Sequence, residues 1–327
     1  MRNISLVILF FLSYSCTSMS QERRDSVINT SDSIFCPKDS IITSRLTLLF
    51  AGDLMQHQAQ INAARTSTGY DYSDCFKFVK EEINRADIAI ANLEVTLGGK
   101  PYRGYPAFSA PDEYLFAIRD AGFDVLITAN NHCLDKGKKG LERTLLMLDS
   151  LQIPHAGTYV NTESREQQYP LLLEKNGFRI ALLNYTYGTN GIKVISPNVV
   201  NYIDKAVMAQ DIEAARAQHP DALIACMHWG DEYQSLPNKE QKNLTNWLLQ
   251  QGVTHIIGSH PHVVQPMELR TDSITGNQHV VVYSLGNFIS NMSARRTDGG
   301  LLFKLELEKD SVCLLYTSPS PRDISGS

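Results

Sequence analysis

The sequence predicts an α/β protein in which helices cover the outer faces of a largely parallel sheet. From Arg45 onward, short apolar or β-branched runs alternate with segments whose apolar residues recur at helical spacing. The last portion of this region is rich in strands and adds antiparallel pairing. No internal repeat and no linker-like stretch interrupts residues 44–309, so we expect them to form a single domain.

The first half of the domain supplies three strands and three helices. Leu46–Ala51 is almost entirely apolar, as expected for a buried strand, and Leu141, Leu145 and Leu148 mark a helix by their spacing. In chain order, the expected elements are strand Leu46–Ala51, helix Asp74–Arg85, strand Ile88–Asn92, helix Asp112–Ala121, strand Val125–Ala129 and helix Lys138–Leu151.

The second half begins with a predicted hairpin. Asn176-Gly177 favours a type I′ turn, which joins strands at Leu171–Glu174 and Arg179–Asn184. Pro170 stands before the first of these strands, where it removes no ladder hydrogen bond. The remaining expected elements are helix Lys205–Gln218, strand Ala222–Met227, helix Lys239–Gln251, and strands Thr254–Gly258, Val264–Arg270, His279–Ser284 and Leu301–Glu308.

Composition and charge exclude several classes of protein. The 327 residues are 43% hydrophobic and 20% charged, which is ordinary for a chain that buries a core and excludes a disordered or collagen-like protein. The formal net charge of −5 and the lack of a basic run give no electrostatic case for nucleic-acid binding. Beyond the first dozen residues, no apolar run approaches the ~20 residues that a membrane-spanning helix needs.

The N-terminal segment predicts export. Arg2 precedes an apolar run, and residues 1–16 end in small and polar residues, as a secretory signal peptide does. Ser13-Tyr14-Ser15-Cys16 also resembles a degenerate lipobox, in which the cysteine carries the lipid anchor of a bacterial lipoprotein. Plain cleavage near Ser18 or Ser20 is the alternative. Residues 17–43 lack periodicity and are expected to act as a flexible tether at the cell envelope, facing the periplasm or exterior.

The C-terminal segment, residues 310–327, departs from the pattern of the domain. It is rich in proline and serine and resembles translated sequencing-adapter read-through, which makes a sequence artefact one interpretation. A natural disordered tail is the other.

Polar side chains occur where predicted buried strands end. Strands that deliver such residues to one carboxyl edge are typical of an active site in an α/β protein. The residues are Asp53, Glu94, Asn131, His132, His228, His260 and His262. Oxygen and imidazole ligands suit Mn, Fe, Zn or Mg, and His260 and His262 can reach two neighbouring ions from one loop. The cysteines are scattered without a CxxC pair, which argues against a thiolate zinc site and a disulfide framework.

The order of these residues resembles the CapA-type capsule synthesis family of poly-γ-glutamate biosynthesis, which is related to calcineurin-like metallophosphoesterases. The resemblance covers Arg45 to Lys309 and implies a metallophosphoesterase-like layered α/β/β/α sandwich with mixed sheets. It is carried by Gly52-Asp53-Leu54-Met55, Asn92-Leu93-Glu94, Asn130-Asn131-His132 with Asp135, His228-Trp229-Gly230 with Glu232, Gly258-Ser259-His260-Pro261-His262 and Ser284-Leu285-Gly286-Asn287.

The resemblance also implies roles for single residues. Asp53 and His262 would hold a first divalent ion, with Glu94 bridging to a second ion held by Asn131, His228 and His260. His132 would stabilise or protonate the leaving group, with Asp135 orienting it. Glu232 is a further candidate acid or base, and a structural partner of a backbone turn is the equal alternative. Two ions would lower the pKa of a shared water towards ~7.

Two positions depart from the metallophosphoesterase pattern. Met55 stands where those enzymes have a histidine, so the first site loses an imidazole, for which His57 is a possible substitute. Glu94 replaces the usual bridging aspartate. The CapA-type family shares both departures, and a single-ion site at Glu94, Asn131, His228 and His260 stays open.

Two functions are consistent with these features. The first is metal-dependent hydrolysis or transfer on a phosphoester, or on an anionic polymer such as polyglutamate, at the cell envelope. The second is a non-catalytic, polymer-binding accessory subunit that works with membrane-embedded capsule synthase subunits. The retained histidines favour the first, and Met55 favours the second. A sugar-binding module is a third possibility, supported only by Trp229 and Tyr233.

Overall fold

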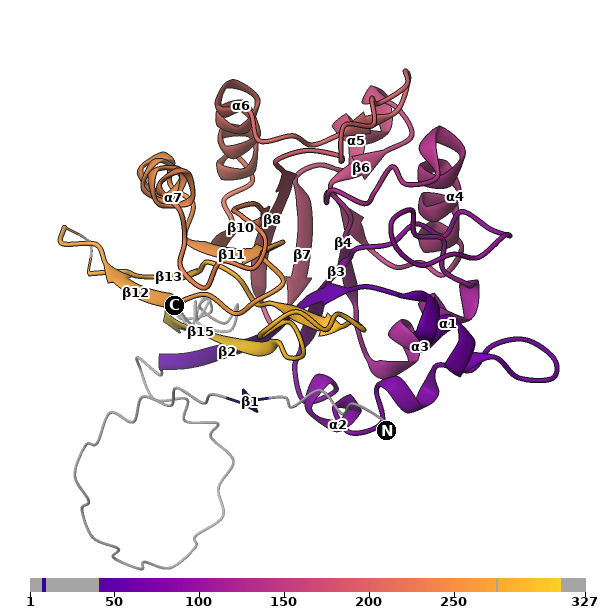
Figure 1. The fold of residues 1–327 in the computed structure, drawn as a ribbon. Coiled ribbons are helices and arrows are strands. Elements are labelled where there is room, and N and C mark those ends of the chain that lie inside the picture. The colour runs from indigo at the N-terminus through magenta and orange to yellow at the C-terminus, as the bar shows by residue number, and fades with distance from the viewer. Residues whose placement is uncertain (1–7, 10–40, 275, 313–327) are drawn as a thin grey trace, which may run out of the picture.

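Two mixed β-sheets pack face to face between two layers of helices (Figure 1). The computed structural model describes residues 8–9, 41–274 and 276–312. The predicted signal peptide and tether therefore lie outside the described residues except at 8–9 and 41–43, and the predicted tail does so beyond 312. Within these residues, no helix has the length and apolar character needed to cross a bilayer.

The first sheet has seven strands in the order β1-β15-β2-β3-β4-β5, with β14 also paired to β2. Strands β2 to β5 are parallel, whereas β15 runs antiparallel to β2. Its strands are β1 (Ile8–Leu9), β2 (Ile41–Leu54), β3 (Ile88–Leu93), β4 (Val125–Ile127), β5 (His155–Ala156), β14 (Asn287–Ile289) and β15 (Leu301–Val312). Strands β2 and β15 each extend three residues beyond the predicted domain limits of 44 and 309.

The second sheet has six strands in the order β12-β13-β11-β10-β8-β7. The central strands are parallel, and the two outer pairs, β12 with β13 and β7 with β8, are antiparallel hairpins. Its strands are β7 (Leu171–Lys175), β8 (Phe178–Thr186), β10 (Ala222–His228), β11 (His255–Ser259), β12 (Met267–Thr271) and β13 (Gln278–Val282). A separate two-stranded sheet pairs β6 (Thr158–Tyr159) with β9 (Val199–Val200).

The helices lie on the outer faces of the two sheets. Figure 1 shows α3 and α4 beside the first sheet and α6 and α7 beside the second. Their bounds are α1 (Gln58–Ala64), η1 (Ser73–Cys75), α2 (Lys80–Ile83), α3 (Asp112–Ala121), α4 (Gly137–Ser150), α5 (Thr162–Gln168), α6 (Lys205–Arg216) and α7 (Lys239–Gln251).

Alternation along each strand divides the apolar residues among three cores. In β2, Leu48 and Phe50 point into the core between the sheets, whereas Leu49 and Ala51 face the helices of the first sheet. In β10, Ile224 likewise faces the first sheet, and its neighbours face α6 and α7. Strands that are buried on both faces are nearly continuous apolar runs, and these runs made the strands predictable from the sequence. The predicted α/β/β/α sandwich with mixed sheets is thus confirmed.

Two predicted elements were wrong in detail. The helix expected at Asp74–Arg85 is broken into η1 and α2. Phe76, between the two, packs against Phe123 and Phe288. The strand expected at Val264–Arg270 begins only at Met267. Pro266 has no N–H to donate to the ladder, and the chain before it runs irregularly.

Asn184 of β8 joins the two sheets next to the Asn130–His132 segment. Its side-chain oxygen accepts a hydrogen bond of 2.7 Å from the Ala129 N–H, beyond the end of β4, and its amide donates 3.1 Å to the Cys226 carbonyl of β10. The residue is fully buried. These bonds fix the loop that follows β4 against the second sheet.

Replacing Asn184 with alanine is therefore expected to lower the free energy of unfolding by about 1–3 kcal/mol, because the buried Ala129 N–H loses its acceptor. Urea denaturation followed by circular dichroism measures this change. Gln167→Ala on the exposed surface of α5 is the control and should stay within about 0.5 kcal/mol of wild type. Equal stability of the two variants would contradict the role assigned to Asn184.

Candidate metal centre

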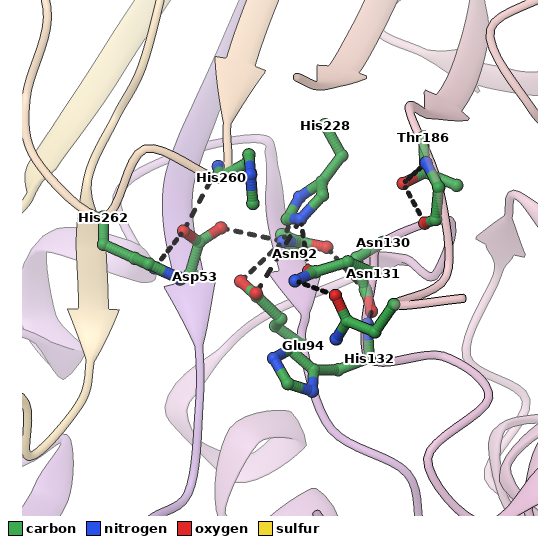
Figure 2. Close-up of polar contacts among 12 residues, drawn as sticks. Asp53, Asn92, Glu94, Asn130, Asn131, His132, Thr186, His228, His260 and His262 are labelled. Atoms are coloured by element: carbon green, nitrogen blue, oxygen red, sulfur yellow. Dashed lines mark hydrogen bonds and ion pairs between the residues drawn. The ribbon is translucent and has the colours of Figure 1, made fainter. Parts of the chain in front are cut away.

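The carboxyl ends of strands from both sheets meet at one buried cluster of polar side chains (Figure 2). Asp53 comes from β2, Glu94 follows β3, and Asn131 and His132 follow β4. The second sheet contributes His228 at the end of β10, and His260 and His262 just after β11. Every one of these residues is at most 4% exposed.

An unusual backbone conformation brings His260 and His262, two residues apart in one loop, to the same cluster. His260 and His262 have φ angles of 99° and 58°, which place both in the left-handed region that non-glycine residues rarely adopt. Such strain costs on the order of 1–3 kcal/mol per residue and clusters at functional sites. At Gly52, a Cβ would collide with the Gly286 carbonyl, so the glycine before Asp53 allows the loop of β14 to pass.

Five ionisable side chains form two overlapping sets of possible metal ligands. In each set, one ligand atom per residue lies within 4.8 Å of the others. The sets are Asp53, Glu94 and His228, and Glu94, His260 and His262. Glu94 belongs to both sets, as expected for a bridging carboxylate. The other ligands are grouped differently from the sequence prediction, which placed His260 with His228 and Asp53 with His262.

Two contacts between a histidine and a carboxylate cross this cluster. His262 Nδ1 lies 3.4 Å from Asp53 Oδ2, and His228 Nε2 lies 3.7 Å from Glu94 Oε1. Asn131 Oδ1 lies 2.8 Å from His228 Nε2, and its amide donates to Asn190. The structure thus brings together all six predicted metal ligands.

Asn92 is a residue of the cluster that was missed from the sequence. Its Nδ2 lies 2.8 Å from Asp53 Oδ1, 3.4 Å from Glu94 Oε2 and 3.3 Å from His228 Nδ1. Its oxygen accepts a hydrogen bond from Asn130. The signal was present, because an asparagine inside the apolar run of β3 needs a polar partner.

Burial and mutual repulsion set the protonation of the cluster. Burial, reinforced by the charge of Asp53, raises the pKa of Glu94 well above its ordinary value. Burial also opposes ionisation of Asp53, but the hydrogen bond and charge of His262 outweigh it and lower the pKa of Asp53.

The pKa values of the three histidines also shift in opposite directions. Burial and the neighbouring imidazoles lower the pKa of His228 well below 6.5, and burial, followed by His262, lowers that of His260 to about 3. Burial acts against the charged form of His262 as well, yet its bond to Asp53 leaves its pKa raised. His228 and His260 are therefore neutral at pH 7, which is the form that binds metals.

The residues present fit one or two divalent cations. Glu94 Oε1 and His260 Nδ1 are buried without a hydrogen-bond partner. Such orphaned atoms are costly unless an ion or water satisfies them. Two carboxylates, three imidazoles and an amide oxygen are also the mixed oxygen and nitrogen set that Mn, Fe or Zn accepts.

The predicted catalytic residues lie in two different settings. His132 Nδ1 is 2.7 Å from Asp135 Oδ2, and the same oxygen accepts the Phe108 N–H, so Asp135 fixes the histidine ring. Glu232 is exposed, yet its charge contributes to the raised pKa of Glu94. Glu232 therefore lies outside the buried cluster.

The remaining candidates are explained by packing. Met55 is buried in the core beside α3, where Tyr114 donates to its carbonyl. His57 is half-buried, accepts a hydrogen bond from the Asn291 N–H and is in neither ligand set. Trp229 is buried and donates to the Tyr283 carbonyl, so it lines no surface groove, whereas Tyr233 is 46% exposed.

The chain is similar in sequence to known capsule biosynthesis proteins. The CapA capsule biosynthesis protein of Bacillus anthracis is 26% identical over 291 residues, covering 84% of this chain and 67% of that protein. The PGA biosynthesis protein CapA of Bacillus subtilis (strain 168) is 28% identical over 284 residues, covering 84% and 71%.

Solved structures align at lower similarity. The NAD nucleotidase of Haemophilus influenzae gives a TM-score of 0.49 at 14% identity and covers 84% of this chain, which spans 55% of that nucleotidase. The 5′-nucleotidase of Candida albicans gives a TM-score of 0.42 at 12% identity. The alignment covers 73% of this chain and 45% of that nucleotidase. The family assignment rests on the sequence matches.

A family model described as bacterial capsule synthesis protein PGA_cap matches residues 47–292, which include every residue of the cluster. The chain therefore belongs to the bacterial capsule synthesis protein family PGA_cap.

Proposed function

We propose that the protein acts in capsule biosynthesis at the cell envelope as a metal-dependent hydrolase or transferase. The observation that carries this proposal is the convergence of Asp53, Glu94, His228, His260 and His262 in one buried cluster, with ligand atoms within 4.8 Å in each set. The bond acted on is a phosphoester, or an amide of an anionic polymer such as poly-γ-glutamate. The relative from Bacillus subtilis, a PGA biosynthesis protein, favours the polymer.

Asp53, Glu94, Asn131, His228, His260 and His262 would hold the cation or cations. When bound, divalent cations supply an activated water near neutral pH and offset negative charge on the substrate. Asn92 keeps Asp53 and Glu94 in place by donating towards both carboxylates. Because both ligand sets draw on both sheets, packing of the sandwich determines the ligand geometry.

His132 is placed to move the proton. With Nδ1 held at 2.7 Å by Asp135, its Nε2 is left to give a proton to the leaving group and to take one back. Asp135 in turn is held by the Phe108 N–H, so the ring keeps one orientation during the exchange. The exposed Glu232 is the second candidate for proton transfer.

An accessory role without turnover is the second candidate function. Met55 stands where metallophosphoesterases have a histidine ligand, and its side chain is buried in the apolar core. In this role the chain would hold polymer for membrane-embedded synthase subunits. The experiments below separate the two.

Protein purified with Mn²⁺ is expected to carry about one to two ions per chain, and His228→Ala should lose at least one, because His228 belongs to a ligand set. Inductively coupled plasma mass spectrometry measures the content. His219→Asn is the matched control, since His219 is exposed before β10 begins and asparagine tolerates its φ of 50°. Metal-free wild type would contradict the proposal.

Loaded wild type is expected to hydrolyse bis(p-nitrophenyl) phosphate, and His132→Ala should lower kcat by about 10²–10⁴-fold, the usual contribution of general acid–base catalysis. The metal content of this variant should equal that of wild type, because His132 is in neither ligand set. Full metal loading without turnover of this ester or of poly-γ-glutamate would favour the accessory role.

Lipid anchoring predicts that processing of the chain in a bacterial host is sensitive to globomycin, since Cys16 would carry the lipid. Cys16→Ala should then release the protein from the membrane fraction, as followed by immunoblotting. Cys36→Ala is the matched control and should leave fractionation as in wild type. Unchanged fractionation of Cys16→Ala refutes the anchor.

A further inference from the structure

The guanidinium of Arg296 pairs with no carboxylate among the residues that the structure describes. Its side chain makes one hydrogen bond there, from Nη1 to Ser235 Oγ at 2.7 Å, and the residue is exposed. The Nε and Nη2 donors therefore remain available. Arg143 shows the occupied alternative, because its Nη1 and Nη2 both donate to Asp112. A free guanidinium edge binds a carboxylate or a phosphate through two parallel hydrogen bonds.

The backbone at Arg296 adopts a conformation that arginine rarely takes. Its φ of 68° lies in the left-handed region, where asparagine is favoured among the residues with a side chain. The next residue fixes this turn, because the N–H and the hydroxyl of Thr297 both donate to the Ala294 carbonyl. The turn itself would favour glycine or asparagine, so the backbone does not account for an arginine at this position.

One side of this turn is tied to a predicted metal ligand. The buried Asn287 donates to the Thr297 carbonyl at 3.0 Å, and Asn287 Oδ1 lies 2.9 Å from His262 Nδ1. Arg296 is therefore two hydrogen bonds and one residue away from His262.

The hydrogen-bond partner of Arg296 is tied to the same histidine loop. Ser235 follows Tyr233, whose N–H donates to the Pro261 carbonyl at 2.8 Å and whose ring lies 6.2 Å from that of His262 between centroids. The guanidinium of Arg296 thus bridges two segments that are each anchored beside His262. Its side chain is held in place next to the cluster rather than free to leave it.

The charges around Arg296 are mixed. The carboxylates nearest along the two segments are Asp231, Glu232 and Asp298, which are all exposed, and none of them pairs with Arg296. Arg295 adds a second exposed guanidinium that has no carboxylate partner within the described chain. Water and salt screen exposed carboxylates, so these three weaken the attraction of an anion but leave the guanidinium edge accessible.

Arg103 is the competing arginine on another side of the cluster. It is exposed and unpaired in the described chain, and it belongs to the segment in which the ring of Tyr105 lies 6.4 Å from that of His132. No hydrogen bond among the described residues holds its side chain. Arg296 is the better candidate because its guanidinium is fixed.

We propose that Arg296 binds an anionic group, a carboxylate or a phosphate, on the polymer unit next to the one that reacts at the cluster. The inference rests on the proposed function for the reacting unit, and it names the residue that selects an anionic substrate. Since Ser235 holds Nη1, the Nε and Nη2 edge binds the anion with two parallel hydrogen bonds. Arg296 is thus a specificity residue outside the metal ligands.

The test measures binding of two anionic oligomers to the full chain in EDTA by isothermal titration calorimetry. γ-Linked hexaglutamate presents carboxylates, linear hexaphosphate presents phosphates, and the preferred oligomer identifies the anion. Arg296→Asn should weaken binding of that oligomer about fivefold, which corresponds to the loss of one charge pair at the surface. Arg296→Lys should recover only part of it, because an ammonium lacks the planar edge.

Removing the cation makes this result independent of turnover. A metal-free or inactive wild type would contradict the proposed function, whereas the calorimetry tests Arg296 alone. Thermal unfolding of Arg296→Asn should occur at a temperature no lower than that of wild type, because asparagine tolerates the φ of 68°. A purely structural role predicts a lower temperature.

Arg216→Ala is the matched control. Arg216 is an exposed arginine without a carboxylate partner among the described residues, and it ends α6 before β10 begins, at the edge of the second sheet opposite the cluster. This variant loses the same charge and should bind as wild type does. Equal affinities of Arg296→Asn and wild type, an equal loss in Arg216→Ala, loss in Arg103→Ala alone, or no binding of either oligomer would each overturn the proposal.

Discussion

The burial of two neighbouring carboxylates, Asp53 and Glu94, is the constraint on which the rest of the structure depends. An ionised carboxylate removed from water is costly unless positive charge or hydrogen bonds compensate it. Here Asn92 donates towards both, His262 pairs with Asp53, and Glu94 keeps one oxygen without a partner. The strand ends, the strained histidine loop and the packing of the two sheets all serve this one arrangement.

The cluster belongs to neither sheet alone. Asp53 and Glu94 come from the first sheet, whereas His228, His260 and His262 come from the second, so no ligand set is complete within one layer. Asn184 and the apolar core between the sheets hold the two contributions together. Metal binding and packing of the sandwich are therefore linked, since a ligand that binds only the folded state stabilises it.

Much of this architecture was predictable because the central strands are buried on both faces and are followed by polar residues. Helices α3 and α7 were predicted to the residue, since each buries one apolar stripe. Helix α5 was missed because it buries no residue and so has no apolar period, and α1 was missed because it buries only Ile61 and Ala64.

The ligand residues were predicted from their positions after strands, but their mutual geometry was not. The left-handed φ angles of His260 and His262 are set by the surrounding fold rather than by residue type. The position of Tyr187 beside His260 depends on the pairing of β8 with β10, which brings the Tyr187 N–H to the His228 carbonyl. Such tertiary placement leaves no local pattern.

The pairing of β2 with β15 has a consequence for synthesis of the chain. Phe50 pairs with Phe303, so the strand that carries Asp53 lacks its antiparallel neighbour until nearly all of the described chain has left the ribosome. At roughly 5–20 residues per second this interval lasts tens of seconds. Throughout it, the backbone N–H and C=O groups of β2 that later pair with β15 have no partner strand. An unpaired strand of this kind is a site at which a nascent chain can aggregate.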